Sequence, residues 1–466
     1  MAQTPAADPL SQVTRLVTER RQAYVERLAD YVRMPSVSAL DWGVAETGAH
    51  IRDVLAAGGF EARLLPTAGQ PAVVAHRAGP AGTPHVVIYG HYDVQPPGED
   101  ALWDSPPFEP AIRDGRMFGR GTADNKGQHL AHVIATELLV ELLGELPCQV
   151  TFVLDGEEEI GSPHLDQAVR GIRDELAGAD LVIVSDGPVD ATGRCQLVYG
   201  LRGILAFELT ATGAARDLHS GHYGEIPPNP LWTLVHLLAS MKDEAGNITI
   251  DGVADLVEPM GATERQAMAA LEPDPAALLA SIGAPRTAAS PAATLGERSM
   301  AWPTLTINGL HGGYDGPRIK TILPHTATAK CDLRLVSGQD ADTVWQLVQR
   351  HVRQHAPDVE LTWHGAMHPS RTPMDTPYAP VVAGAVRSVT GEEPVHVPVA
   401  GGSLPMWVFT RSLGLPALLL PLGNVDEANH APNENFTLDR FYQGIAISAA
   451  TLLAVAGRTA SGTAAR

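Results

Sequence analysis

The sequence contains only three cysteines, Cys148, Cys195 and Cys331, and no CxxC pair. This odd number and wide spacing argue against both a disulfide framework and a thiolate zinc site. The longest apolar stretches, near residues 445–456, are shorter than the roughly 18–20 residues needed to span a bilayer. Residues 1–16 lack the basic and apolar regions of a secretory signal. We therefore expect a cytoplasmic protein without a membrane anchor.

Basic residues are also in the minority, with 33 Lys and Arg against 53 Asp and Glu and a formal charge of −20. Such a charge repels nucleic acid and anionic membranes, whereas a local cluster of carboxylates attracts divalent cations. Nucleotide-binding motifs are absent too, because the glycine-rich residues 119–127 have neither the GxGxxG nor the GxxxxGK[ST] spacing. These features exclude nucleic acid, membranes and nucleotides as expected partners.

The chain of 466 residues is long enough for about two or three domains. Several short apolar runs have the length of buried strands, and longer apolar-periodic segments at 128–143 and 437–456 have the pattern of helices. The runs are residues 86–89, 150–154, 181–184 and 417–420. Strands that alternate with helices predict an α/β fold with a mostly parallel sheet.

A segment of different texture lies between the third and fourth of these runs. Residues 205–210 and 326–336 alternate apolar and polar side chains, and residues 230–241 and 342–352 are amphipathic, while residues 271–303 predict short helices and loops. This pattern predicts an inserted α+β domain with helices on one face of an antiparallel sheet. We place the catalytic metal-binding domain at 1–202 and 368–466, and the inserted domain at 203–367.

Polar side chains follow the apolar runs at the positions where the strands should end. Taken singly, each has an ordinary explanation: a loop histidine, a solvated run of glutamates, or an aspartate that caps a helix. Together they supply two imidazoles and several carboxylates without cysteine, a set that suits two adjacent zinc or manganese ions. The residues are His91, Asp93, Asp124, Glu157, Glu158, Glu159, Asp186 and His430.

Seven ordered motifs resemble those of a known family, the dinuclear metal exopeptidases and amidohydrolases. That family includes cytosolic nonspecific dipeptidase, carnosinase, aminoacylase and succinyl-diaminopimelate desuccinylase. The motifs are residues 90–96, 119–127, 155–162, 185–186, 217–221 and 401–403, together with His430. The resemblance extends over nearly the whole chain, from about residue 13 to residue 456.

The resemblance implies two divalent ions in each subunit, with zinc as the first expectation and manganese or cobalt as alternatives. Asp124 would bridge the two ions. His91 and Asp186 would complete the ligands of one ion, and Glu159 and His430 those of the other. Such a pair of ions lowers the pKa of a shared water and polarises a carbonyl group.

The resemblance also implies catalytic roles for residues that bind no metal. Glu158 would be the general base that takes a proton from the attacking water and returns it to the leaving amine. Asp93 would orient the site from behind the ligands. His219, in the inserted lid or dimerisation domain, would stabilise the oxyanion from the other subunit of a homodimer.

Four further residues match substrate-binding positions of the family: Arg334, Gly401, Gly402 and Ser403. Arg334 would pair with the free carboxylate of the substrate, a role that suits the planar guanidinium group. The glycines and Ser403 would bind the substrate backbone. Val399 stands where the dipeptidases often have arginine, which leaves the details of this pocket open, and Asp155 replaces a more frequent glutamate.

The chain length and the run at residues 199–203 are closer to the dipeptidase branch than to the shorter desuccinylases and aminoacylases. We therefore expect a metallo-dipeptidase that cleaves the amide bond of dipeptides or small peptides with a free carboxyl end. An N-acyl amino acid amidohydrolase with the same mechanism is the nearest alternative. A non-catalytic metal-binding interaction protein is the third, and the presence of Glu158 beside all five expected ligands argues against it.

Overall fold

The computed structural model describes residues 8–288 and 293–460, which form two compact units. Unit 1 contains the described residues up to Tyr199, Thr372–Val397 and the described residues from Val408 onward. Unit 2 contains the described residues of Gly200–Arg371 together with Pro398–Trp407. Residues 1–7, on which the expectation of no secretory signal partly depends, and residues 289–292 of the predicted short-helix segment lie outside the described residues.

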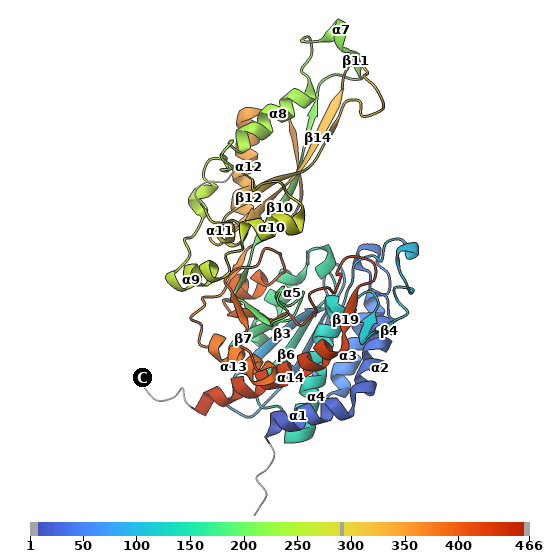
Figure 1. Cartoon of the computed structure of the whole chain (residues 1–466), viewed down its shortest axis with the longest axis vertical. Helices are drawn as coiled ribbons and strands as arrows, with labels where there is room; N and C mark the ends of the chain where they lie inside the picture. Colours follow the sequence, from blue (N-terminus) through green and yellow to red (C-terminus); the bar gives the residue numbers. More distant parts are fainter. Residues whose placement is uncertain (1–7, 289–292, 461–466) are drawn as a thin grey trace, which may run out of the picture. The chain divides into compact units, whose positions relative to one another are not determined.

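Unit 1 is built on an eight-stranded sheet (Figure 1). Its strands, in spatial order, are β1 (Glu61–Leu65), β2 (Ala72–Arg77), β6 (Gln149–Asp155), β3 (His85–His91), β7 (Leu181–Val184), β18 (Ala417–Leu419), β8 (Gln196–Val198) and β17 (Val395–Val397). The neighbours β6, β3, β7 and β18 are parallel, as are β8 and β17, whereas the other pairs are antiparallel. The predicted α/β fold with a mostly parallel sheet is therefore confirmed.

Helices bury the central strands on both faces. Ile88 of β3 joins a core that contains residues of α4, α13 and α14, which lie side by side. Tyr89 points to the opposite face and contacts Phe409, with ring centroids 5.5 Å apart. Fully burying a side chain of this size contributes roughly 1.5–3 kcal/mol, so these near-continuous apolar strands fix the position of the sheet.

The helices of unit 1 are α1 (Pro9–Glu19), α2 (Arg21–Val32), α3 (Val44–Ala57), α4 (Gln128–Leu143), α5 (Leu165–Gly171), α6 (Arg173–Leu176), α13 (Ala379–Thr390) and α14 (Leu438–Ala456). A small sheet of β4 (Ala111–Arg113), β5 (Arg116–Phe118) and β19 (Asn435–Thr437) completes the unit. In the described part of the chain, no helix combines the length and the apolar character required to cross a membrane.

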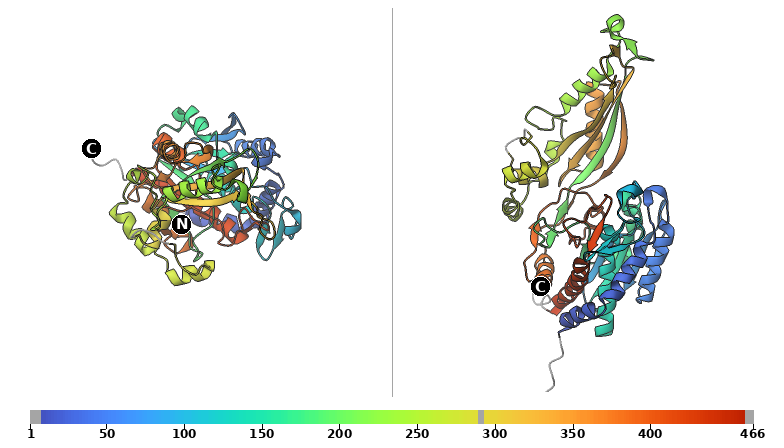
Figure 2. Two further views of the ribbon diagram at one scale, coloured as in Figure 1. Left: turned by 90° about the horizontal axis from the view of Figure 1, so that it is seen from above. Right: turned by 45° about the vertical axis from the view of Figure 1, so that its right-hand side comes forward.

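Unit 2 contains a four-stranded antiparallel sheet. In spatial order its strands are β12 (Thr304–Gly312), β14 (Thr326–Leu335), β10 (Gly203–Thr212) and β15 (Glu360–Met367). Helices α8 (Pro230–Met241) and α12 (Ala341–His355) pack on it through a shared apolar core (Figure 2). Helix α8 begins where the sequence predicts, because the Asn229 side chain accepts a hydrogen bond from Leu231 N at 3.0 Å.

The remaining elements of unit 2 are short. They are β9 (Gly200–Leu201), β11 (Leu218–His219), β13 (Ile322–Leu323), β16 (Ser370–Arg371), α7 (Ser220–Tyr223), α9 (Ala262–Ala270), α10 (Pro275–Ile282) and α11 (Leu295–Met300). Pro398–Trp407 groups with this unit rather than with the sequence around it, since Ala400 pairs with Leu201 and Ser403 contacts Arg334. The boundaries inferred from the sequence place the inserted domain at 203–367 and residues 398–407 in the other domain.

Candidate metal centre

Neighbouring parallel strands of unit 1 bring polar side chains to one edge of the sheet. His91 is the last residue of β3, and Asp186 follows shortly after β7. Glu158 and Glu159 begin the short helix η4 (Glu158–Ile160), which follows β6. Because β6, β3 and β7 are adjacent and parallel, their carboxyl ends meet at the same edge, where ligands bind in open α/β sheets.

Asp124 lies between two histidines. Its Oδ1 atom is 3.1 Å from His91 Nε2, and its Oδ2 atom is 3.1 Å from His430 Nε2. The carboxylate is buried, and Asp124 lies within the glycine-rich turn of residues 119–127, which leads into α4. Each oxygen thus faces a different imidazole, the arrangement required of a carboxylate that bridges two cations.

The other two predicted ligands complete a group around each histidine. Asp186 Oδ2 is 3.3 Å from His91 Nε2, and Glu159 Oε2 is 3.2 Å from His430 Nε2. The structure therefore brings all five predicted ligands together in unit 1, as two groups of three that share Asp124. His430 is the most exposed of them, with 55% of its side chain accessible.

The donor atoms fit divalent cations. The buried His91 Nε2 makes no well-directed hydrogen bond within the described residues, although two carboxylate oxygens lie within 3.3 Å. Ligand atoms of His91, Asp124 and Glu159 all lie within 4.8 Å of one another. Burial, together with the charge of Asp124, raises the pKa of Glu159 to about 7. Buried carboxylates that lie this close together are stabilised by a nearby positive charge. Oxygen and imidazole donors suit zinc, manganese or cobalt.

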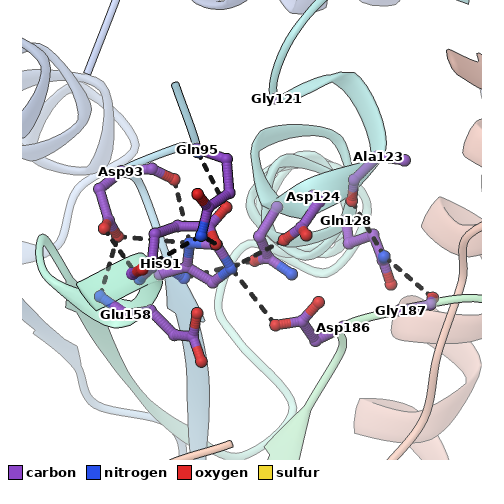
Figure 3. Close-up of polar contacts among 12 residues, drawn as sticks. His91, Asp93, Gln95, Gly121, Ala123, Asp124, Gln128, Glu158, Asp186 and Gly187 are labelled. Carbon is purple, nitrogen blue, oxygen red and sulfur yellow. Dashed lines mark hydrogen bonds and ion pairs between the residues drawn. The ribbon is translucent and has the colours of Figure 1, made fainter. Parts of the chain in front are cut away.

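Asp93 holds the histidine and the glutamate turn in place (Figure 3). The His91 Nδ1 atom lies 3.0 Å from the Asp93 backbone oxygen, so this nitrogen carries the proton and Nε2 keeps its lone pair for a metal. The Asp93 carboxylate accepts hydrogen bonds from Glu158 N at 3.1 Å and Glu159 N at 3.0 Å. One buried side chain therefore ties the ends of β3 and β6 together.

Glu158 lies beside the predicted ligand Glu159 and is buried. It is only 9% exposed, and in Figure 3 it lies on the same side of the site as His91 and Asp186. Burial raises the pKa of Glu158 well above its usual range, and the charges of Asp186 and Glu159 raise it further. A carboxyl group whose pKa has been raised in this way holds a proton more readily than an exposed glutamate does.

Comparison with known proteins assigns the chain to a family. Residues 87–454 match the model of peptidase family M20/M25/M40. The chain belongs to this family. The resemblance inferred from the sequence is therefore confirmed, and this M20 peptidase is a metal-dependent hydrolase.

Two relatives of this M20 peptidase are named as dipeptidases. The Cys-Gly metallodipeptidase dug1 of Schizosaccharomyces pombe is 31% identical, over 94% of this chain and 96% of its own length. The Beta-Ala-His dipeptidase of Homo sapiens is 29% identical, over 80% of this chain and 75% of its own length. These similarities support the dipeptidase branch of the family.

A solved structure has the same fold. The M20 family metallo-carboxypeptidase Sso-CP2 from Sulfolobus solfataricus superposes with a TM-score of 0.86 at 31% identity, covering 93% of this chain and 99% of that one. The likeness extends through both units of this M20 peptidase.

Two polar residues near the centre were not assigned roles from the sequence. Asn125 Oδ1 accepts a hydrogen bond from His91 N at 3.3 Å, and its Nδ2 donates to Ser185 O at 2.6 Å. Gln95 donates to both carboxylate oxygens of Glu159, from its backbone N at 3.1 Å and from Nε2 at 2.9 Å. Both residues lie within the motifs at 90–96 and 119–127. Their closeness in the sequence to Asp93 and Asp124 was the only indication that they could support the site.

The residues predicted to bind substrate lie in unit 2. Arg334 Nη1 donates a hydrogen bond to Ser403 Oγ at 3.2 Å, and Ser403 directly follows Gly401 and Gly402. His219, at the end of β11, is exposed, and its Nδ1 accepts a hydrogen bond from Gly221 N at 3.0 Å. In the neutral imidazole this bond places the proton on Nε2, which is then a donor.

Arg202 is a third residue that the sequence reasoning missed. Its Nη2 donates to Gly401 O at 3.4 Å, and Ser403 Oγ donates to its backbone oxygen at 2.8 Å. Its Nε atom is buried and has no hydrogen-bond partner among the described residues. Burial lowers the pKa of Arg202, and the nearby charge of Arg334 lowers it further. Two guanidinium groups beside one serine make a site that favours an anion.

Proposed function

We propose that this M20 peptidase is a dipeptidase that uses two divalent ions to cleave the amide bond of dipeptides with a free carboxyl end. The observation that carries the proposal is the Asp124 carboxylate, which lies 3.1 Å from both His91 Nε2 and His430 Nε2 with Glu158 close by. The names of the relatives support the substrate class. Zinc is the first candidate for the metal, and a cytoplasmic location stays a prediction.

In this proposal each polar residue has one task. The ions held by the five ligands would polarise the scissile carbonyl and lower the pKa of a shared water. Glu158 takes one proton from the water while the water oxygen bonds to the carbonyl carbon. Glu158 then delivers that proton to the leaving amine as the C–N bond breaks. Asp93 fixes the orientation of the His91 ring through its backbone oxygen and the position of the Glu158 backbone through its carboxylate.

The substrate carboxylate would bind to unit 2. Arg334 offers a planar guanidinium, and Arg202 offers a second positive charge with an Nε–H group that has no hydrogen-bond partner among the described residues. The Ser403 hydroxyl would turn its proton from Arg202 O to the substrate carboxylate. Charge-assisted hydrogen bonds of this kind are stronger than neutral ones, and leaving them unmade is costly. We therefore expect the enzyme to discriminate against dipeptides whose terminal carboxylate is blocked as an amide.

A substrate panel tests the proposed function. Metal-stripped protein, resupplied with Zn²⁺, Mn²⁺ or Co²⁺, is assayed on dipeptides, their C-terminal amides, and N-acetyl and N-succinyl amino acids. We expect metal-dependent turnover of free dipeptides and at least tenfold lower kcat/KM on the amides. Preference for the acyl substrates would instead identify an N-acyl amino acid amidohydrolase, and inactivity on every substrate despite bound metal would contradict the proposal.

Unit 2 carries an exposed apolar surface that supports the proposed homodimer. Trp232 and Val235 of α8 are 58% and 40% exposed, and Ile307 and Leu310 of the edge strand β12 are 51% and 44% exposed. An edge strand offers unpaired backbone groups to a second copy of the chain. A homodimer formed in this way would let His219 of one subunit serve the metal centre of the other.

We expect His219→Ala to lower kcat by about 10²–10³-fold with a smaller change in KM, because an oxyanion donor acts mainly in the transition state. Steady-state kinetics on a dipeptide measure both constants. His222→Ala is the matched control, since His222 is an exposed histidine whose ring stacks on His219 at 4.6 Å. An effect of His219→Ala on KM alone would argue against the oxyanion role.

Mixing two inactive variants tests whether His219 acts across the dimer. A heterodimer of His219→Ala and Glu158→Gln subunits contains one site with both native residues only if His219 comes from the partner. Recovery of activity on mixing is therefore expected. Activity that stays at the level of the separate variants, in heterodimers shown to have formed, would place His219 in its own subunit's site.

A further inference from the structure

We infer that Glu434 is a positioning residue that holds the Asp124 and His430 segments together and so sets the metal affinity of the centre; this inference rests on the proposed function. Glu434 is buried, with 0% of its surface exposed. Its carboxylate accepts four hydrogen bonds, all from residues of the glycine-rich turn (residues 119–127) that contains Asp124.

The four hydrogen bonds divide evenly between the two oxygens. Oε1 accepts from Ala123 N and Asp124 N, both at 3.0 Å. Oε2 accepts from Gly121 N at 2.9 Å and from Arg120 Nη1 at 2.8 Å. The backbone amide of Asp124 is thus fixed directly by Glu434, and the direction of the Asp124 carboxylate between the two histidines depends on that amide.

Glu434 belongs to the same loop as the other side of the centre. It follows His430 closely and precedes β19, which pairs with β5 just before the glycine-rich turn. The Glu434 backbone oxygen accepts a hydrogen bond from Gly119 N at 3.0 Å, and Arg120 Nη2 donates to Ala431 O at 3.3 Å. Side chain and backbone therefore join the two segments at both ends of the turn.

The loop that carries His430 needs such an anchor. Ala428, His430 and Asn433 all adopt positive φ, at 54°, 58° and 63°. Left-handed conformations of residues other than glycine are unfavourable and persist only where surrounding contacts impose them. Glu434 supplies those contacts at the end of the loop, while its carboxylate fixes Asp124. It does not touch the substrate, and it acts through the geometry of these two ligands.

The chemistry of the site requires a carboxylate and not merely a side chain of that size. Four N–H groups point at its two oxygens, and Arg120 is itself only 1% exposed. The amide of glutamine would turn an NH2 group toward two N–H donors in either orientation. It would also leave the Arg120 charge buried without its counter-charge, which is strongly unfavourable.

The test measures metal binding by purified Glu434→Gln, using calorimetric titration of the metal-free protein with Zn²⁺ and the absorption spectrum of the Co²⁺-loaded protein. We expect an affinity about 10–100-fold lower than that of the wild type and an altered Co²⁺ spectrum, since partners behind the ligands have effects of this size. Glu434→Asp keeps the charge but shortens the side chain by one carbon, so we expect partial recovery of both properties.

Glu264→Gln is the matched control. Glu264 is a buried carboxylate of unit 2 that binds Arg371 through both oxygens, at 2.9 and 2.7 Å, and accepts a hydrogen bond from Gly261 N. This variant loses a similar ion pair far along the chain from the metal ligands. We expect it to lower the unfolding temperature without changing Zn²⁺ affinity or the Co²⁺ spectrum.

The possible outcomes are distinct. Wild-type Zn²⁺ affinity and an unchanged Co²⁺ spectrum in folded Glu434→Gln would overturn the inference. If Glu434→Gln does not fold, the same result in Glu434→Asp would overturn it. Failure of the wild-type protein to bind Zn²⁺ or to hydrolyse any dipeptide would instead contradict the proposed function.

Discussion

We expect Glu158→Gln to lower kcat by about 10²–10⁴-fold while the protein still binds its metal ions. Glutamine has nearly the same shape as glutamate but cannot take a proton from water at neutral pH. The five predicted ligands are left in place, and the backbone N–H of residue 158 can still donate to Asp93. Loss of turnover without loss of metal separates a general base from a ligand.

Steady-state kinetics on a dipeptide and metal analysis of the same preparation check this prediction. Glu157→Gln is the matched control, because Glu157 directly precedes Glu158 but binds Gln70 N at 3.0 Å and His164 Nδ1 at 2.7 Å. We expect this control to change stability more than kcat. A Glu158→Gln enzyme with near-normal kcat would refute the assigned role, and loss of metal would make Glu158 a ligand.

If the wild type binds two ions as proposed, we expect Asp124→Asn to bind one ion and to lose at least 10³-fold in kcat/KM. An amide has one oxygen, so it can face His91 or His430 but not both, whereas the carboxylate places one oxygen 3.1 Å from each. The two-metal contribution to catalysis is worth several kcal/mol, and each 1.36 kcal/mol corresponds to a factor of ten in rate.

Metal content per subunit, measured after dialysis against a limiting metal concentration, checks the stoichiometry. Asp30→Asn is the control, because Asp30 is an exposed carboxylate whose only described ion pair is with Arg33 on the surface. We expect it to leave metal content and activity unchanged. Two tightly bound ions in Asp124→Asn would show that the carboxylate does not bridge.

Much of unit 1 was predictable because its strands bury both faces. The apolar runs at 181–184 and 417–420 coincide closely with β7 and β18, and the first is followed directly by Ser185 and Asp186. Helix α8 was equally predictable, since Asn229 and Pro230 mark its first turn. In these segments local sequence and tertiary position favour the same structure.

The edge strand β12 was not predicted, and the reason is physical. Its first residues, 304–308, alternate polar and apolar side chains, but the alternation stops at Gly309, where the register with β14 shifts, and most of the strand is exposed. Strand signals depend on burial, and an edge strand buries little.

Apart from Asp93, the residues that support the predicted ligands were not found by sequence reasoning. Glu434 and Asp124 lie 310 residues apart in the chain, and no periodicity relates them. The role of Glu434 becomes visible only when the fold joins β19 to β5. Family motifs thus predicted the ligands and the supporting role of Asp93, whereas the role of Glu434 was inferred from its hydrogen bonds.

The position of the Asp124 carboxylate between the two histidines affects how metal ions would bind to the centre. In the proposed two-metal centre both donor groups contain this residue, so binding of one ion would be thermodynamically linked to binding of the other. If an ion in the first site changes the affinity of the second site by some factor, an ion in the second site changes the affinity of the first by the same factor. A titration with metal therefore reports a coupling free energy between the sites, and Asp124 is the side chain through which that coupling passes.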